Sequence, residues 1–184
     1  MQYLQYYESP LGQLFMTGTL TSLTGLWFVT PKCCASALLD EYQEQNLSIF
    51  AQTKNWLDIY FKGNIPDFTP ALSLEATPFR KMVWDILLTI PYGQTTTYGE
   101  IAKKIAQKNG LAKMSPQAVG GAVGHNPISL IIPCHRVIGA NGNLTGYAGG
   151  IDKKIKLLNI EKINTSTMFI PHTKHTSSNE IFQQ

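Results

Sequence analysis

The strongest constraint on the fold of this chain is a series of three helix starts between residues 77 and 124. Two combine a side chain that can cap a helix with a proline in the first turn, and one has capping-box spacing: Thr77-Pro78, Ser115-Pro116 and Thr97-Tyr98-Gly99-Glu100. These signals predict helices over residues 79–89, 98–105 and 117–124. A short turn that contains Gly110 separates the last two, so we expect a helix-turn-helix.

The residues before this region predict a small α/β unit. Three stretches have strand-like composition and would form an antiparallel meander: residues 2–7, 13–19 and 23–29. Helical patterns follow at residues 35–45 and 47–62, and turn residues dominate from there to residue 75. A last helix is expected at residues 152–159, and the polar chain beyond Ile163 is expected to be weakly ordered.

These elements divide the 184 residues into three parts. Residues 1–75 would form an N-terminal scaffold domain with its linker, residues 76–163 a mainly helical domain, and residues 164–184 a tail. The fold class is therefore α+β, with a small N-terminal antiparallel sheet and its helices followed by a domain built around the helix-turn-helix.

Charge is distributed unevenly between these parts. The formal net charge of +3 hides a net −4 in residues 1–75, which carry three basic and seven acidic side chains. Residues 76–163 carry eleven basic and four acidic side chains, a net +7. This asymmetry points to an anionic partner for the second part, with nucleic acid as the leading candidate and a merely solubilising charge as the alternative.

Cysteine use and hydropathy indicate a cytoplasmic protein without a membrane anchor. No apolar run reaches the roughly 18–20 residues that span a bilayer, and the first residues lack the pattern of a signal peptide. Cys33, Cys34 and Cys134 are an odd number of cysteines, which argues against a disulfide framework and for a reducing compartment. Cys33 and Cys34 have no His or second Cys pair nearby in the sequence, so no zinc site is expected.

The predicted helix over residues 117–124 has an unusual composition. It reads Gln-Ala-Val-Gly-Gly-Ala-Val-Gly, and each interior glycine costs about 0.8–1 kcal/mol relative to alanine. Close packing against another helix would explain these glycines. The alternative is that a helix with few side chains enters the minor groove of DNA, which is only about 6 Å wide, and binds there with little regard to base sequence.

A single cysteine follows the apolar run that ends at Pro133. Cys134 is flanked by His135 and Arg136, and a neighbouring base or positive charge increases the thiolate fraction of a thiol. Adjacent residues often point apart, so the Cys-His pair alone leaves open an inert cysteine of the core.

The string Pro133-Cys134-His135-Arg136-Val137 resembles the active-site signature of the O6-alkylguanine-DNA alkyltransferases. Further motifs of that family follow in the family's order: Thr77-Pro78-Phe79, Ile90-Pro91-Tyr92-Gly93, Tyr98-Gly99-Glu100-Ile101-Ala102, Ala118-Val119-Gly120-Gly121-Ala122, Asn126-Pro127, Gly146-Tyr147-Ala148-Gly149-Gly150 and Leu157-Leu158-Asn159-Ile160-Glu161. The match is close over residues 77–161 and looser at Ser9-Pro10-Leu11-Gly12. It implies a ribonuclease-H-like N-terminal domain and a winged-helix-like C-terminal domain.

The resemblance also implies a reaction, the direct reversal of DNA alkylation. Cys134 would attack the alkyl carbon on O6 of a guanine turned out of the duplex, keep the alkyl group and release the restored base. His135 would act as a base through a bridging water, with Glu161 orienting its ring. Tyr98 would help to turn the nucleotide out and would donate a proton towards N3 of the departing guanine. The expected partner is duplex DNA containing O6-alkylguanine or O4-alkylthymine, bound by a monomer without cofactor or metal.

The remaining residues that the resemblance implies contact DNA or the flipped base. They are Thr97, Ser115, Gln117, Ala118, Gly121, Asn126, Arg136, Val137, Tyr147 and Ala148. Asn126 would tie the DNA-binding helices to the active-site segment, and Arg136 is expected to be more structural than catalytic. Gln117 is a departure, because many members carry an arginine there to fill the gap left by the extruded base. Glutamine has no charge and a shorter reach, so weaker DNA binding or slower flipping is expected.

Three other functions fit parts of the sequence. A non-catalytic protein that binds alkylated DNA would lack the nucleophile that Cys134 offers. A transcription factor would need more base-reading side chains than the glycine-rich helix carries. A cysteine hydrolase would need an oxyanion hole, for which the chain has no independent signal.

Overall fold

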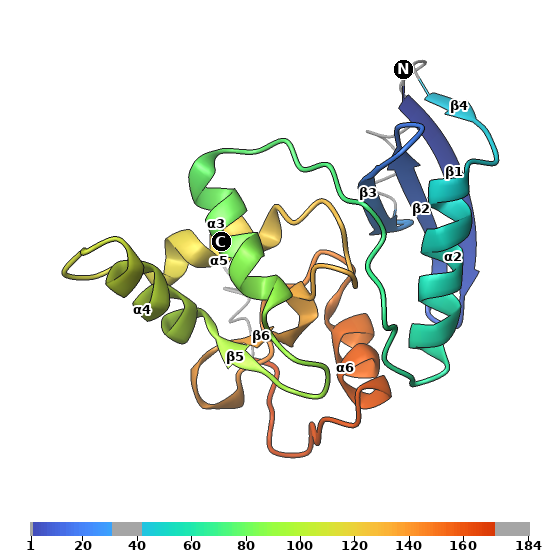
Figure 1. The fold of residues 1–184 in the computed structure, drawn as a ribbon. Helices are drawn as coiled ribbons and strands as arrows, with labels where there is room; N and C mark the ends of the chain where they lie inside the picture. The colour runs from blue at the N-terminus through green and yellow to red at the C-terminus, as the bar shows by residue number, and fades with distance from the viewer. Residues whose placement is uncertain (1, 31–41, 172–184) are drawn as a thin grey trace, which may run out of the picture.

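The computed structural model describes residues 2–30 and 42–171, and Cys33 and Cys34 lie outside this part of the chain. An N-terminal α/β part and a mainly helical part lie side by side, joined by a long segment between α2 (Ser48–Phe61) and α3 (Pro78–Leu88) (Figure 1). Within the described residues, no helix is long and apolar enough to cross a membrane.

The N-terminal part is a four-stranded sheet in the order β3-β2-β1-β4. Its strands are β1 (Gln2–Ser9), β2 (Gly12–Gly18), β3 (Leu23–Phe28) and β4 (Tyr42–Glu44). The first three pair antiparallel, which confirms the predicted meander. The short β4 runs parallel to β1, however, so the sheet is mixed and the prediction of a fully antiparallel sheet is wrong.

The predicted helix over residues 35–45 is also wrong at its end, where Tyr42–Glu44 form β4. Residues 35–41 lie outside the described chain. The backbone at β4 pairs with β1, and such a tertiary partner outweighs helix propensities of a few tenths of a kcal/mol per residue.

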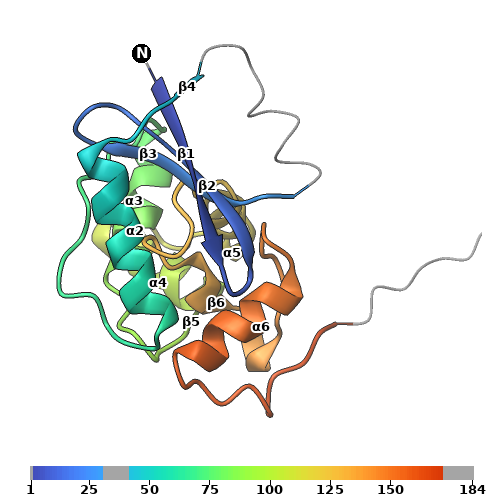
Figure 2. The same cartoon turned by 90° about the vertical axis from the view of Figure 1, so that its right-hand side faces the viewer.

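The helix α2 lies against this sheet (Figure 2). Its apolar residues recur at helical spacing and are buried, as expected from the pattern over residues 47–62: Ile49, Phe50, Trp56, Leu57 and Tyr60. This face brings large aromatic rings into the space between the sheet and the C-terminal part of the chain.

The C-terminal part is built from short helices that begin as predicted. Thr77 accepts a hydrogen bond from the Arg80 amide at the start of α3, and Ser115 does the same for the Ala118 amide at α5 (Pro116–Gly124). A complete capping box opens α4 (Tyr98–Lys108). The predicted helix-turn-helix is therefore confirmed as α4 and α5, which pack on each other and on α3.

The reactive segment follows α5 in short elements. They are η1 (Cys134–Arg136, a 3-10 helix), β6 (Val137–Ile138), which pairs parallel with β5 (Thr96–Thr97), η2 (Ala140–Gly142) and finally α6 (Ile151–Ile160).

The N-terminal sheet holds the segment that leads to Cys134. The amide of Leu26 in β3 donates to the Pro127 carbonyl at 2.9 Å, and the Ser129 amide donates to the Leu26 carbonyl at 2.8 Å. The free edge of β3 therefore pairs with the chain just before the cysteine, and one continuous core joins the two parts.

Part of the predicted tail has a defined place. The Leu144 amide donates to the Phe169 carbonyl at 2.8 Å, and the Phe169 amide donates to the Gly142 carbonyl at 3.1 Å. Weak order is therefore the wrong expectation for the chain up to this bridge, because its backbone hydrogen bonds have partners here. Residues 172–184 lie outside the described chain.

Candidate active site

Cys134 stands at the end of a buried and tightly braced segment. The Asn126 side chain donates to the Ile132 carbonyl at 2.8 Å and accepts from the Ile128 amide at 3.0 Å. Between these contacts Leu130 adopts φ 71°, a backbone conformation that leucine rarely takes. The bracing holds the thiol in a fixed place, where Cys134 is only 6% exposed.

The thiol is neutral at rest but has a cation in its neighbourhood. Burial raises the pKa of the Cys134 thiol, while a hydrogen bond from Asn126 and the charge of Lys154 oppose that rise. Lys154 is itself buried, and its Nζ donates to the Val137 carbonyl at 2.6 Å and to the Thr145 carbonyl at 2.9 Å. Burial lowers the pKa of Lys154 to about 8, so the ammonium form still dominates at neutral pH.

His135, which directly follows Cys134 in the sequence, forms a buried pair with Glu161. Nε2 of His135 lies 2.6 Å from Oε1 of Glu161. Burial lowers the pKa of His135 despite the nearby carboxylate, so the imidazole is neutral at rest. Because an ionised carboxylate only accepts hydrogen bonds, the proton belongs on Nε2. The basic nitrogen is then Nδ1, which is buried and has no hydrogen-bond partner within the described chain.

Glu161 receives several further donors. Nε of Arg136 donates to Oε2 at 2.8 Å, the Gly93 amide donates to Oε2 at 3.2 Å, and the Tyr60 hydroxyl donates to Oε1 at 2.8 Å. Burial alone would raise the pKa of Glu161, but hydrogen bonds from His135 and Arg136 and the charge of Arg136 lower it to about 2. The carboxylate is therefore ionised at neutral pH and held from several sides.

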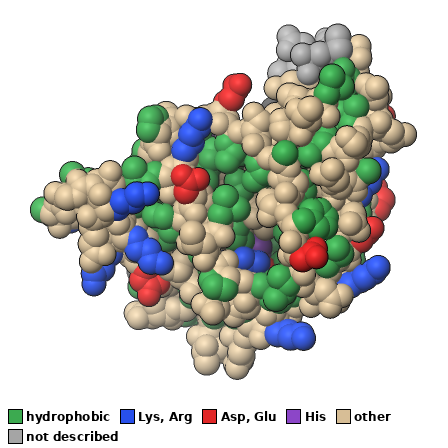
Figure 3. Space-filling model, viewed as in Figure 1, with side chains coloured by type: hydrophobic (Ala, Val, Ile, Leu, Met, Phe, Trp, Pro, Cys, Tyr) green, Lys and Arg blue, Asp and Glu red, His purple; other side chains and the backbone are tan. Residues whose placement is uncertain are grey.

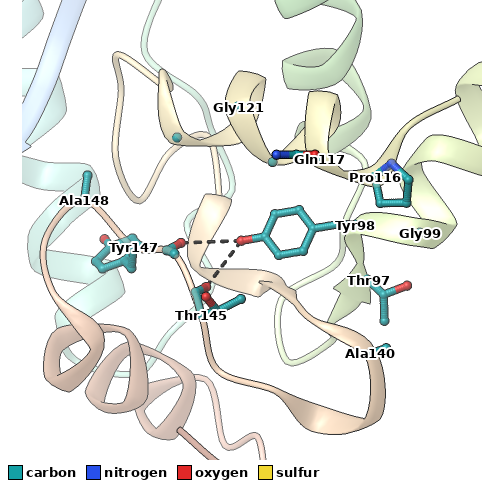
Figure 4. A pocket seen from close by; sticks show the side chains of 13 residues that line it. Thr97, Tyr98, Gly99, Pro116, Gln117, Gly121, Ala140, Thr145, Tyr147 and Ala148 are labelled. Atoms are coloured by element: carbon teal, nitrogen blue, oxygen red, sulfur yellow. Dashed lines mark hydrogen bonds between the residues drawn. The ribbon is translucent and has the colours of Figure 1, made fainter. Parts of the chain in front are cut away.

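A cavity of about 1000 Å³ opens between α5, the start of α4 and the loop that precedes α6 (Figure 4). Six of the predicted site residues line it: Thr97, Tyr98, Gln117, Gly121, Tyr147 and Ala148. The Tyr98 ring crosses the cavity and its hydroxyl donates to the Thr145 carbonyl at 3.3 Å. Burial, together with the charge of the Cys134 thiolate, raises the pKa of Tyr98 to about 12, so this hydroxyl keeps its proton.

Two family models together match nearly the whole described chain. The ribonuclease-like domain of 6-O-methylguanine DNA methyltransferase matches residues 2–75, and the DNA-binding domain of the same family matches residues 78–163. The chain belongs to the O6-methylguanine-DNA methyltransferase family.

Individual relatives of this family are similar over most of their length. A methylated-DNA–protein-cysteine methyltransferase of Mycobacterium tuberculosis is 43% identical over 155 residues, which cover 84% of this chain and 89% of the relative. One of Methanosarcina acetivorans is 43% identical over 159 residues, which cover 86% and 97%. The crystal structure of Mycobacterium tuberculosis OGT in complex with DNA aligns with a TM-score of 0.75 and 41% identity, covering 87% of this chain and 92% of that one. The shared two-domain α+β fold is thus that of the family.

The other predicted site residues lie outside the cavity lining of this family member. Cys134, Asn126 and Val137 are buried, whereas Ala118 and the capping residue Ser115 are exposed on α5. Burial is the main cause that raises the pKa of both Tyr98 and Tyr147, and the charge of the Cys134 thiolate adds to each shift.

The side chain of Arg136 lies inside the protein. Its guanidinium is almost fully buried, bonds to both oxygens of Glu161 and donates to the Ile90 carbonyl at 2.7 Å. Each of its three guanidinium nitrogens donates a hydrogen bond within the protein, and a contact of Arg136 with DNA stays a prediction. The more structural role expected for it fits these contacts.

Sequence reasoning missed Tyr60 and Lys154. Tyr60 lies on α2, 101 residues before its partner Glu161, and no local pattern connects the two positions. Lys154 could have been found, because it shares the apolar face of α6 with Leu157 and Leu158 at helical spacing. Lysine side chains are almost never fully buried unless they have a partner, so a lysine on an apolar helix face is a candidate functional residue.

Proposed function

We propose that this protein repairs alkylated DNA by transferring the alkyl group from O6 of guanine to its own Cys134, once per molecule. The observation that carries the proposal is the buried hydrogen bond between Glu161 and His135, the residue that directly follows Cys134. A cavity lined by α5 and Tyr98 offers room for a base. The proposed reactive residues all belong to residues 76–163, and residues 1–75 serve as the scaffold domain. Family membership supports the same reaction class.

The proposed reaction is a single displacement at carbon. Nδ1 of His135, through a bridging water, takes the proton of the Cys134 thiol. Sulfur then bonds to the alkyl carbon, and the bond from that carbon to O6 breaks with its electron pair moving into the guanine ring. Tyr98, which keeps its proton up to high pH, donates that proton to the ring, and the proton that His135 took from the thiol returns through solvent to the Tyr98 oxygen. The balance is one thioether and one neutral guanine from a thiol and an alkylguanine.

The glycine-rich face of α5 supports binding of the duplex through its minor groove. Gln117 and Gly121 line the cavity mouth, and a Cβ added at Gly121 or Gly124 would meet no protein atom within 4 Å. The slim helix is therefore not explained by close packing at these two positions. A base turned out of the duplex would enter the cavity beneath the helix.

Finer features of the function belong to the same proposal. The substrate class is O6-alkylguanine together with O4-alkylthymine, and the protein acts as a cytoplasmic monomer. The odd number of cysteines and the +7 charge of residues 76–163 support this assignment. Competition between duplexes that carry each lesion tests the lesion class. Sedimentation of the free protein tests whether it is a monomer.

Intact-protein mass spectrometry tests the proposed transfer. Wild-type protein mixed with a duplex that carries O6-methylguanine should gain the mass of one methyl group and no more, even with excess DNA. The Cys134→Ala variant should bind the duplex and gain nothing. Repeated turnover, or binding by the wild type without any mass gain, would contradict the proposal.

A further inference from the structure

Tyr60 brings the N-terminal part of the chain into contact with the proposed catalytic pair. Its hydroxyl donates to Oε1 of Glu161 at 2.8 Å and lies 3.3 Å from Nε2 of His135. It therefore touches both members of the pair from a helix that belongs to the other domain, and it contacts neither the cavity nor the proposed DNA surface.

We propose that Tyr60 is a positioning residue for alkyl transfer, whose hydroxyl holds the Glu161 carboxylate against His135 so that Nδ1 of the imidazole remains free to accept a proton. This inference rests on the proposed function. It gives the N-terminal domain a part in the chemistry in addition to its role as scaffold.

The position of one proton is central to the proposal. A tyrosine hydroxyl has a single proton to donate, and here the shorter of its two contacts is with the carboxylate oxygen. If that proton went to Nε2 of His135 instead, the neutral ring would carry its own proton on Nδ1 and could not act as a base there. Ionised Glu161 accepts one hydrogen bond from the Tyr60 hydroxyl and one from Nε2–H of His135, and this arrangement excludes the tautomer with the proton on Nδ1.

The surroundings hold the Tyr60 ring in place. The residue is fully buried, stacks on Trp56 with ring centroids 5.3 Å apart, and meets the rings of Tyr92 and His135 edge to face. Burial and the charge of Glu161 raise the pKa of Tyr60 well above its ordinary value, so the hydroxyl stays a donor throughout the pH range of folding. The hydroxyl is therefore a fixed donor aimed at Oε1.

A role in folding alone is the competing explanation, because buried tyrosine hydroxyls usually have a partner. Tyr92 provides a matched comparison. It is an adjacent ring of the same type, and its hydroxyl donates to the Ile160 carbonyl at 3.0 Å, not to the carboxylate. Both Tyr→Phe changes remove one interior hydrogen bond and keep the ring, but only one changes the surroundings of Oε1.

The experiment measures single-turnover methyl transfer at saturating duplex as a function of pH, together with DNA affinity and thermal unfolding. Tyr60→Phe should transfer about tenfold more slowly per folded molecule, because a hydrogen bond to a charged group is lost. DNA affinity should stay unchanged. The acid limb of the profile should move to higher pH, because Glu161 with one donor fewer holds the proton of the imidazolium more tightly and raises the pKa of His135. Tyr92→Phe should keep the wild-type rate and profile.

Two results would overturn the inference. One is a wild-type rate and an unmoved acid limb in Tyr60→Phe. The other, independent of any variant, is an imidazole nitrogen NMR spectrum of the wild type that places the neutral proton of His135 on Nδ1. If the wild type transfers no methyl group at all, the proposed function fails, and that outcome is distinct from both.

Discussion

We expect the buried ammonium group of Lys154 to stabilise the charge that develops on the sulfur of Cys134, because its charge opposes the rise in the pKa of that thiol. It is held by two backbone carbonyls, and within residues 2–30 and 42–171 it has no carboxylate partner among its hydrogen bonds. In a low-dielectric interior an unneutralised cation acts strongly on a neighbouring group. One of its carbonyl partners, that of Thr145, also accepts from Tyr98, so the same residue orders the loop that forms the cavity wall.

Replacing Lys154 with methionine should raise the pKa of the Cys134 thiol and slow methyl transfer about tenfold or more at pH 7. In the wild type this contribution is present below pH 8 and is lost as the pH rises through about 8, where Lys154 releases its proton. Single-turnover rates from pH 6 to pH 9 measure both effects. Lys156→Met, which removes an exposed lysine of the same helix, is the control and should leave the profile unchanged.

Gln117 lines the cavity, and we expect it to bind DNA more weakly than an arginine would at this position. Changing Gln117→Arg adds a charge and a longer reach at the start of α5, so duplex affinity and the rate of transfer from duplex DNA should rise several-fold at low salt. The rate with free O6-methylguanine base should stay the same, because the chemistry is untouched. Equal affinity and equal duplex rate for the two proteins would refute this assignment.

At the scale of elements, the glycines of α5 lower the stability of the helix and leave it with a surface that carries few side chains. Gly121 has no positive φ and open space where a Cβ would stand, so Gly121→Ala should increase the free energy of unfolding by roughly 0.5–1 kcal/mol. The larger Gly121→Leu should weaken duplex binding by about tenfold or more, because its side chain projects into the groove-facing side of the helix.

Denaturant unfolding and DNA titration of these variants test both effects. Gly63→Ala is the contrasting control in the N-terminal part. Gly63 has φ +78°, so alanine there should destabilise the fold without changing DNA affinity. Tight duplex binding by Gly121→Leu would show that α5 does not enter the groove.

The helix starts were predictable because each is decided by a few adjacent residues. Thr77, Thr97 and Ser115 cap the expected helices through their own side chains. The strand β4 was missed because its conformation depends on β1, some forty residues earlier in the chain. Local patterns carry no information about such a partner.

The candidate site shows the same division. Cys134, His135 and Glu161 were found through motifs that the resemblance supplied, and the structure brings the last two to 2.6 Å. The contact of Tyr60 with Glu161 and the burial of the Arg136 side chain were not predictable, because both follow from packing between segments far apart in sequence. The resemblance implied a contact of Arg136 with DNA or the base and a role more structural than catalytic, and its guanidinium bonds to both oxygens of Glu161.

At the scale of the whole molecule, the division of charge between an acidic N-terminal part and a basic C-terminal part predicts which lysines make DNA affinity depend on salt. Figure 3 shows Lys and Arg side chains over the part of the surface that carries α4. Lys103 and Lys113 line a smaller hollow that shares Gly99 and Pro116 with the large cavity, so both lysines stand near its rim. Replacing both with alanine should reduce the slope of log affinity against log salt by roughly one to two.

The same measurement on a variant with Lys54 and Lys62 replaced is the control. These lysines lie on and just after α2 in the acidic N-terminal part, so the slope should stay at its wild-type value. If both double variants reduced the slope equally, the C-terminal lysines would contact the phosphates no more than the N-terminal lysines do.

Enclosure of Cys134 also has a consequence for the lifetime of the unused protein. Peroxides and small electrophiles react with thiolates that they can reach, and here the sulfur is protonated at rest and almost closed off from solvent. A molecule that can act only once must keep its sulfur reduced for as long as it waits. The same burial that makes activation necessary should therefore protect the unused thiol from oxidation.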